Sequence, residues 1–218
     1  MNKQIIVALD GMSEKKALDL AVSLKGLVWG FKINDLLFNG AAIIGKLKKY
    51  GKVFADAKLY DIPNTVKNSV TALPTAGADL ITVHASGGIE MMKAAKKSAG
   101  KSKIIAVTIL TSVNGQQEFL NNSISKLAKN ATNAGVNGIV CSARELKTIA
   151  KIGELRSLIK IVPGIRPIWY DKNDDQKRIV TPREAILAGA DFIIIGRPIT
   201  ESLNPAKTVR IILADLNK

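Results

Sequence analysis

Short runs of apolar residues, many of them β-branched, alternate along this chain with longer segments in which apolar positions recur every three or four residues. The short runs predict buried strands, and the longer segments predict amphipathic helices. The predicted strands are Ile5 to Leu9, Val28 to Ile33, Val53 to Lys58, Leu80 to His84, Ile104 to Thr108, Gly138 to Cys141, Ile159 to Val162 and Phe192 to Gly196. The predicted helices are Ser13 to Leu24, Pro63 to Ala76, Ile89 to Ser98, Ser123 to Asn133, Ala143 to Ile152, Pro182 to Leu187 and Pro205 to Leu216. Strands joined in this way by crossover helices predict an α/β protein folded as a (β/α)8 TIM barrel.

A recurring four-residue motif supports the barrel. Ala76-Gly77-Ala78-Asp79, Ala134-Gly135-Val136-Asn137 and Ala188-Gly189-Ala190-Asp191 each end a predicted helix and lead into a predicted strand. We expect each glycine to supply a left-handed helix cap. The glycines are 58 and 54 residues apart, which is the length of two strand-helix units. Because no low-complexity or Pro/Gly/Ser-rich linker interrupts this order, we expect a single catalytic domain over residues 1–218.

The charge of the chain raises the question of a nucleic-acid partner. Lys and Arg number 32 against 18 Asp and Glu, which gives a formal net charge of +14. The lysines are scattered over predicted helix surfaces, however, and only 5% of the residues are aromatic, so platforms for stacking bases are scarce. We therefore expect no nucleic-acid binding, and an anionic small molecule as the use of the positive potential.

A single cysteine, Cys141, limits the redox and metal chemistry. An intramolecular disulfide and a zinc site built on several thiolates are both excluded, and a reducing compartment fits this composition. The apolar run near the N-terminus is too short for a secretory signal, and no segment has the length needed to span a bilayer. The sequence predicts a soluble cytoplasmic protein with no membrane partner.

The densest group of charged residues directly follows a predicted strand. Asp56 and Lys58 are two positions apart, so they project from the same face of a strand, and Asp61 follows in the loop. Burying such charges is costly unless each is paired. The preceding Val53-Phe54-Ala55 is apolar, and the following Ile62-Pro63-Asn64-Thr65 is typical of a helix start. We therefore interpret the group as a catalytic cluster rather than a solvated turn.

Further polar residues fall at the ends of other predicted strands, where the active sites of such barrels lie. Asp10 ends the first strand, Lys32 lies near the end of the second, and Thr111 and Ser112 follow the fifth. These positions predict that all four side chains reach one mouth of the barrel.

The last two strands are followed by candidates for phosphate binding. Pro163-Gly164-Ile165-Arg166 follows the seventh strand, and Gly196-Arg197-Pro198 follows the eighth. The backbone N–H groups of Gly196 and Arg197, together with the forked Arg197 guanidinium, suit a phosphate dianion.

Taken together, these motifs resemble those of one enzyme family. The segments Asp56-x-Lys58-x-x-Asp61-Ile62-Pro63-Asn64-Thr65, Pro163-Gly164-Ile165-Arg166-Pro167, Asp174-Asp175-Gln176-Lys177-Arg178 and Gly189-Ala190-Asp191 to Ile195-Gly196-Arg197-Pro198-Ile199 are similar to motifs of the orotidine 5′-monophosphate (OMP) decarboxylase family. The resemblance extends over essentially the whole chain. It implies a carboxy-lyase that converts OMP to uridine 5′-monophosphate (UMP) and CO2 in pyrimidine nucleotide synthesis. It further implies that no cofactor or metal is used, and that the active sites are shared within a homodimer.

The resemblance also implies roles for individual residues. A charge array would consist of Lys32, Asp56, Lys58 and Asp61, with Lys58 as the proton donor and Asp61 supplied by the other subunit. Asp10, Lys32 and the neighbour's Thr65 would contact the ribose, Thr111 or Ser112 the pyrimidine, and Arg197 and Gln176 the phosphate. Ile62, Pro163, Gly164 and Gly196 are implied to line the same substrate site. The chain departs from the family at Leu59-Tyr60, where an aromatic-histidine pair is commoner, and at Asn34, where glycine is expected.

Two other interpretations stay open at this point. A lyase or aldolase acting on a pentulose or hexulose phosphate would use the same Asp-x-Lys-x-x-Asp pattern with Mg²⁺, but it needs further acidic ligands and leaves Ile62 and Thr65 unexplained. A non-enzymatic basic binding protein would leave the charges clustered at strand ends without a purpose.

Overall fold

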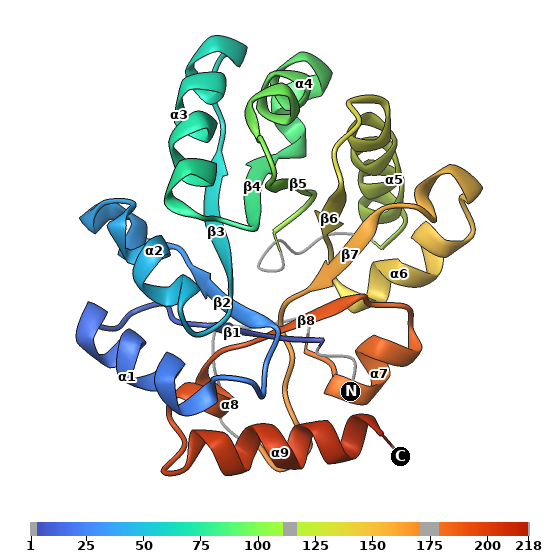
Figure 1. Ribbon diagram of the computed structural model, residues 1–218. Helices are drawn as coiled ribbons and strands as arrows, with labels where there is room; N and C mark the ends of the chain where they lie inside the picture. The colour runs from blue at the N-terminus through green and yellow to red at the C-terminus, as the bar shows by residue number, and fades with distance from the viewer. Residues whose placement is uncertain (1–3, 111–116, 171–178, 218) are drawn as a thin grey trace.

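Parallel strands pair in sequence order and close into a barrel in the computed structural model, which describes residues 4–110, 117–170 and 179–217. The strands are β1 (Ile5–Ala8), β2 (Gly30–Ile33), β3 (Lys52–Leu59), β4 (Leu80–His84), β5 (Lys103–Val107), β6 (Gly138–Val140), β7 (Ile159–Val162) and β8 (Phe192–Ile195). Pairing of β8 with β1, in which Ile194 lies opposite Ile6, closes the sheet. The predicted single-domain TIM barrel is therefore confirmed (Figure 1).

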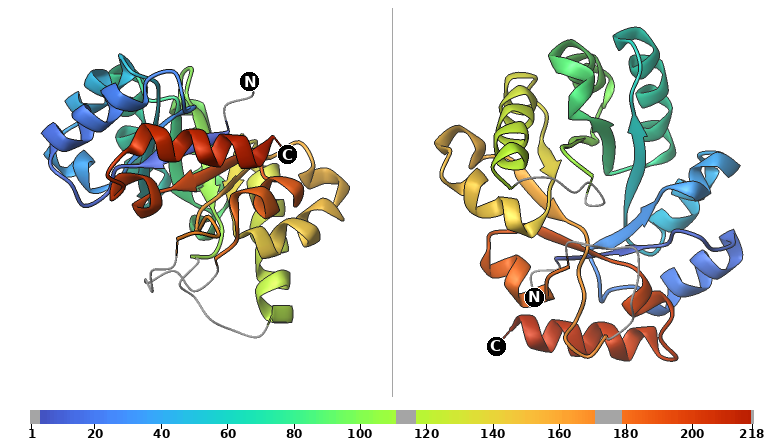
Figure 2. Two further views of the ribbon diagram at one scale, coloured as in Figure 1. Left: turned by 90° about the horizontal axis from the view of Figure 1, so that it is seen from below. Right: turned by 180° about the vertical axis from the view of Figure 1, so that it is seen from behind.

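Helices surround the barrel on its outer face, as Figures 1 and 2 show from three directions. They are α1 (Glu14–Leu24), α2 (Ala42–Lys48), α3 (Pro63–Ala76), α4 (Gly88–Ser98), α5 (Gln117–Asn133), α6 (Ala143–Ala150), α7 (Pro182–Leu187), α8 (Arg197–Thr200) and α9 (Pro205–Leu216), with 3-10 turns at Asp35–Asn39, Ala85–Gly87 and Gly153–Leu155. The last helix, α9, packs against both α1 and α7 and so completes the ring. None of the helices in the described ranges is long and apolar enough to cross a membrane.

Local signals account for most element boundaries. Proline occupies the first turn of α3, α7 and α9, where its missing N–H costs nothing, and these helices begin where the sequence predicted. The start of α5 lies at Gln117 rather than at the predicted Ser123, because the poor helix formers Asn121 and Asn122 obscured it. Leu9, Thr108, Cys141 and Gly196 lie one residue beyond the ends of the observed strands, although they were predicted to be the last strand residues. The backbone N–H groups of Leu9, Thr108 and Cys141 still donate to the neighbouring strand, so the sheet ends gradually there.

Two apolar layers hold the strands in place. Side chains that point into the barrel form a dry inner cluster, and those that point outward pack against the helices. The inner cluster consists of Ile6, Phe54, Leu80, Ile105, Ile161 and Ile194. Trp29 and Phe192, whose ring centres are 5.2 Å apart, pack against it at the amino ends of the strands. The barrel is therefore filled at that end.

The recurring four-residue motif forms a clasp between strands. Gly77, Gly135 and Gly189 all have positive φ, as the predicted left-handed caps require. Two residues after each glycine, a side-chain oxygen accepts a hydrogen bond from the backbone at the start of the preceding odd-numbered strand. These bonds join Asp79 to Val53 N at 2.9 Å, Asn137 to Ile104 N at 3.0 Å and Asp191 to Lys160 N at 2.8 Å. The repeat thus anchors the amino ends of the strands and leaves their carboxyl ends for chemistry.

Candidate active site

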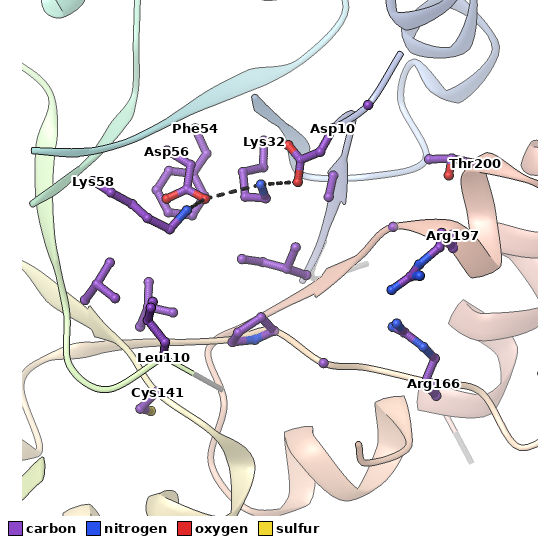
Figure 3. A pocket seen from close by; sticks show the side chains of 18 of the residues that line it. Asp10, Lys32, Phe54, Asp56, Lys58, Leu110, Cys141, Arg166, Arg197 and Thr200 are labelled. Carbon is purple, nitrogen blue, oxygen red and sulfur yellow. Dashed lines mark hydrogen bonds and ion pairs between the residues drawn. The ribbon is translucent and has the colours of Figure 1, made fainter. Parts of the chain in front are cut away.

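A cavity of about 490 Å³ lies at the carboxyl ends of the strands, where catalytic sites of this fold occur. Phe54, Val107, Val140 and Ile194 give it apolar walls. The predicted site residues that line it are Asp10, Lys32, Asp56, Lys58, Pro163, Gly164, Gly196 and Arg197. Figure 3 shows the charged side chains from the first three strands on one side of the cavity and two arginines on the other.

Four charged side chains form a continuous series of ion pairs along one wall of the cavity (Figure 3). Lys32 Nζ lies 2.6 Å from Asp10 Oδ2 and 3.2 Å from Asp56 Oδ2. Lys58 Nζ lies 2.6 Å from the same Asp56 oxygen. One carboxylate oxygen therefore serves two ammonium groups, and charges of alternating sign follow one another from β1 to β3.

The backbone of β3 is irregular where it presents Lys58. Its pairing with β4 shifts register between Ala55 and Leu59. Lys58 has a φ of 46°, which makes it the one non-glycine residue with positive φ in the described part of the chain. Asp56 and Lys58 share the cavity as predicted, but they do so through a bulge rather than through plain strand alternation.

Asp56 is held by neighbours on both adjacent strands. From β4, Thr82 Oγ1 donates to Asp56 Oδ1 at 2.9 Å. From just beyond β2, Asn34 Nδ2 donates to the backbone oxygen of Asp56 at 2.7 Å. Asn34, at which the chain departs from the family pattern, therefore contacts a residue of the site directly. Neither Thr82 nor Asn34 was predicted as a site residue, because only their pairing with β3 gives them this role.

The electrostatics of the cavity favour the ionised forms of Lys32 and Asp56. Burial by itself lowers the pKa of Lys32, which is 7% exposed, but the carboxylates of Asp56 and Asp10 outweigh burial and raise the pKa above its ordinary 10.5. Burial likewise tends to raise the pKa of Asp56, yet the ammonium groups of Lys32 and Lys58 bring the pKa below its ordinary 3.8. Asp56 therefore carries a negative charge, and Lys32 a positive charge, at neutral pH.

Two arginines lie across the cavity from these ion pairs (Figure 3). Arg197, at the start of α8, was predicted. Arg166 follows β7, is 9% exposed, and donates from Nη1 to the backbone oxygen of Ile165 at 2.9 Å. Its guanidinium carbon lies 5.7 Å from the centre of the Tyr170 ring. The Pro-Gly-Ile-Arg motif indicated this place in the sequence, although no role was predicted for Arg166 itself.

Three predicted residues within the described ranges do not line this cavity. Asp61, Ile62 and Thr65 are exposed on the segment that joins β3 to α3 and begins that helix. Asp61 Oδ1 accepts a hydrogen bond from Ile62 N at 2.7 Å. The predicted contacts Thr111, Ser112 and Gln176 lie outside the described residues. The roles proposed for all six stay predictions.

These features define a class of protein. Among the described residues, no group of three or more His, Cys, Asp or Glu side chains is placed to hold a metal ion. The cavity instead offers ammonium and carboxylate groups on one wall and guanidinium groups on the other. A (β/α)8-barrel enzyme for a small anionic substrate is the class that this combination defines.

Comparison with known proteins identifies the family within that class. The chain belongs to the orotidine 5′-phosphate decarboxylase / HUMPS family, whose model matches residues 3–212. The family predicted from the sequence is therefore confirmed, as is its carboxy-lyase class.

Individual relatives cover nearly the full chain. The orotidine 5′-phosphate decarboxylase of Pseudoalteromonas translucida is 41% identical over 100% of this chain and 97% of its own, and that of Dichelobacter nodosus is 39% identical over 97% and 98%. Among solved structures, the orotidine 5′-phosphate decarboxylase of Lactobacillus acidophilus has a TM-score of 0.82 at 33% identity, over 99% of this chain and 100% of its own. The orotidine 5′-monophosphate decarboxylase of Methanocaldococcus jannaschii, solved with the inhibitor BMP, also has a TM-score of 0.82, at 27% identity over 100% of both chains.

The shared carboxylate predicts a pH-dependent loss of stability in Asp56→Asn. Without the Asp56 carboxylate, the nearly buried Lys32 and the partly exposed Lys58 lose the charge between them, so we expect the free energy of unfolding at pH 7 to fall by about 3 kcal/mol. Because the folded-state pKa of Asp56 is lowered, its carboxylate stabilises the fold above the ordinary pKa of 3.8, and this contribution is lost as pH falls through the lower folded value. Urea titrations should show a constant difference from wild type between about pH 5 and 8, narrowing below about pH 4.

Asp10→Asn provides the control for this experiment. The Asp10 side chain is 44% exposed and contacts Lys32 alone among the ammonium groups of the array. Its replacement should cost clearly less stability than that of Asp56. Equal losses of unfolding free energy in the two variants would show that a carboxylate shared by two ammonium groups stabilises the fold no more than one paired with a single ammonium group.

Proposed function

We propose that the OMP decarboxylation to UMP given by family membership is carried out in this cavity, with Lys58 as the proton donor. The observation that carries the proposal is the series of ion pairs from Asp10 through Lys32 and Asp56 to Lys58. It places the Lys58 ammonium group, paired with Asp56, beside a cavity whose other walls are partly apolar.

The single cysteine, Cys141, is free and buried, which favours a cytoplasmic location.

The chemistry explains the need for such a group. Loss of CO2 breaks the bond between C6 of the pyrimidine and its carboxyl carbon, and the electron pair stays on C6. The ring cannot readily delocalise that pair. An ammonium group beside C6 stabilises the developing negative charge and then transfers its proton to C6. Lys58 suits this role because it lines the cavity and Asp56 Oδ2 holds its Nζ at 2.6 Å.

The rest of the array serves binding. We assign the ribose hydroxyls to Asp10 and Lys32, whose polar atoms lie next to Lys58 and Asp56 along the same wall. This order sets the sugar beside the reacting base. It also makes Lys32 a residue with two functions, since it neutralises Asp56 and contacts substrate.

We assign the phosphate to the opposite side of the cavity. Arg197 and Arg166 line that side, and their guanidinium groups point toward the same region (Figure 3). Forked guanidinium donors match phosphate oxygens in geometry. Gln176 stays a predicted third contact. Binding energy gained at this distance from C6 contributes to the stabilisation of the transition state.

We further propose a homodimer in which each site borrows Asp61 from the other subunit. Asp61, Ile62 and Thr65 lie outside the cavity of their own chain although they belong to the same motif as Asp56 and Lys58. Tyr60 and Ile62 are apolar or aromatic yet 62% and 67% exposed. An interface formed around this segment would cover both side chains and bring Asp61 to a neighbouring cavity.

Lys58→Ala tests the central assignment. We expect kcat to fall by more than roughly 10³-fold, because both charge stabilisation and proton transfer are lost. The measurement is the change in absorbance as OMP is consumed, with and without EDTA. Retention of activity within about tenfold of wild type would contradict the role of Lys58. Wild-type activity that EDTA abolishes and Mg²⁺ restores would favour the sugar-phosphate lyase alternative.

Arg197→Ala tests the phosphate assignment. We expect kcat/KM for OMP to fall by roughly 10²-fold, while the slow reaction of orotidine, which lacks the phosphate, stays unchanged. Arg210→Ala, at an exposed arginine of α9, is the matched control and should leave both substrates unaffected. The assignment fails if Arg197→Ala slows orotidine as much as OMP.

Subunit exchange tests the shared site. In a mixed dimer of Lys58→Ala and Asp61→Ala subunits, one site carries both substitutions and the other carries neither. Equal mixing with random pairing makes about half of the dimers mixed, so activity should recover to about a quarter of wild type. We expect each variant to be inactive when it is assayed alone. If verified exchange restores no activity, Asp61 does not act across the interface.

A further inference from the structure

Thr82 contacts both members of the pair that we assign to catalysis. Its Oγ1 donates to Asp56 Oδ1 at 2.9 Å, and the same oxygen accepts a hydrogen bond from the backbone N–H of Lys58 at 2.8 Å. The hydroxyl therefore uses its donor on a side chain and its acceptor on the main chain. Both partners lie on β3, whereas Thr82 lies on β4.

A hydroxyl at this position is unusual for the inside of the barrel. Leu80, two residues earlier on the same face of β4, belongs to the apolar inner cluster, and Thr82 itself is fully buried. Valine has the same shape, prefers strands equally well and has no polar atom to satisfy. A buried hydroxyl is favourable only where its hydrogen bonds are made, as they are here.

The hydroxyl also stabilises the irregular backbone that presents Lys58. Between Ala55 and Leu59 the pairing of β3 with β4 shifts register, and Lys58 adopts a φ of 46° that non-glycine residues rarely take. Such a conformation persists only where its surroundings hold it. The acceptor that Thr82 offers to the Lys58 N–H supplies one such contact inside the bulge.

We propose that Thr82 is a positioning residue that preorganises the Asp56 and Lys58 pair by fixing the carboxylate and the backbone bulge together. This proposal rests on the catalytic roles proposed above for Asp56 and Lys58. Thr82 does not line the cavity, so it acts through these two residues and not on the substrate. Its effect is confined to the placement of the ammonium group relative to C6.

This placement predicts a specific kinetic signature. The assigned ribose contacts, Asp10 and Lys32, lie on or just beyond β1 and β2, and the assigned phosphate contacts follow β7 and β8. The two hydrogen bonds of Thr82 go to Asp56 and Lys58 and to none of these assigned binding residues, so we expect its hydroxyl to affect catalysis far more than substrate binding. Loss of that hydroxyl should lower kcat and leave KM nearly unchanged, because a small displacement of a reacting group is enough to slow chemistry strongly.

The experiment compares Thr82→Val, Thr82→Ser and Thr82→Ala with wild type. Valine keeps the shape without the hydroxyl, and we expect kcat to fall by roughly 10²-fold with KM within about threefold. Serine keeps the hydroxyl and should retain kcat within about threefold. Serine and alanine differ by one oxygen atom, so the ratio of their kcat values isolates the hydroxyl even if the valine variant does not fold.

Thr108→Val is the matched control. Thr108 follows β5, is 5% exposed, and donates from Oγ1 to the backbone oxygen of Val140 at 2.9 Å, so its loss also removes a buried hydrogen bond. We expect it to lower the thermal midpoint as Thr82→Val does while leaving kcat unchanged. An equal fall in kcat for both valine variants would show general loosening of the barrel and overturn the proposal.

Lys58→Ala, assayed in parallel, separates this proposal from the one on which it rests. If Lys58→Ala stays active, the proposed function of the array is wrong. If Lys58→Ala is inactive while Thr82→Val or Thr82→Ala keeps the wild-type kcat, the role of Thr82 alone is wrong. Equal losses in the serine and alanine variants would also overturn it, because the hydroxyl would then make no difference.

Discussion

The site is organised around one carboxylate that is shared by two ammonium groups. Asp56 Oδ2 lies within ion-pair distance of both Lys32 and Lys58, while Oδ1 accepts from Thr82. Removal of a nearly buried charge from water is costly, and the cost is offset only when every lone pair has a partner. The lysines therefore stabilise Asp56 in its ionised form, and Asp56 in turn holds Lys58 beside the cavity. The cost of burying each of these charges is offset by its interaction with the charges of opposite sign beside it.

The barrel supplies the conditions for this arrangement. At the amino ends of the strands, the apolar inner cluster fills the barrel. Hydrogen bonds from the backbone to Asp79, Asn137 and Asp191 join neighbouring strands there. At the carboxyl ends, the same inward-facing positions change from apolar to polar, as in Phe54 to Asp56 on β3 and Leu80 to Thr82 on β4. The apolar layer below the charges lowers the local dielectric and strengthens their interactions. Stability and chemistry thus occupy opposite ends of one sheet.

The series of ion pairs and the two arginines lie on different sides of the cavity, so each can contact a different part of a substrate. The series of ion pairs lies where the base and sugar are proposed to bind, and Arg166 and Arg197 lie on the far side. An anionic group held by the arginines would position the remainder of a nucleotide against Lys58 without itself taking part in bond breaking. Such a division uses remote binding energy to stabilise a transition state. The exposed segment with Asp61 and Ile62 shows that one chain does not bring all of the motif to its own cavity.

The sequence by itself determined the barrel, most element boundaries and the main charged residues. Periodicity, prolines and glycine caps act over a few residues, so β4, β7 and α3 match their predicted bounds, and Lys32, Asp56 and Lys58 were identified from strand ends and one compact motif. Only the tertiary structure decided the bulge at Lys58, the contacts of Thr82 and Asn34 with Asp56, and the place of Arg166 beside Arg197. Those contacts join neighbouring strands that are 22 to 26 residues apart in sequence. Their formation depends on the register between strands, which is fixed only when the apolar faces of neighbouring strands pack together in the barrel.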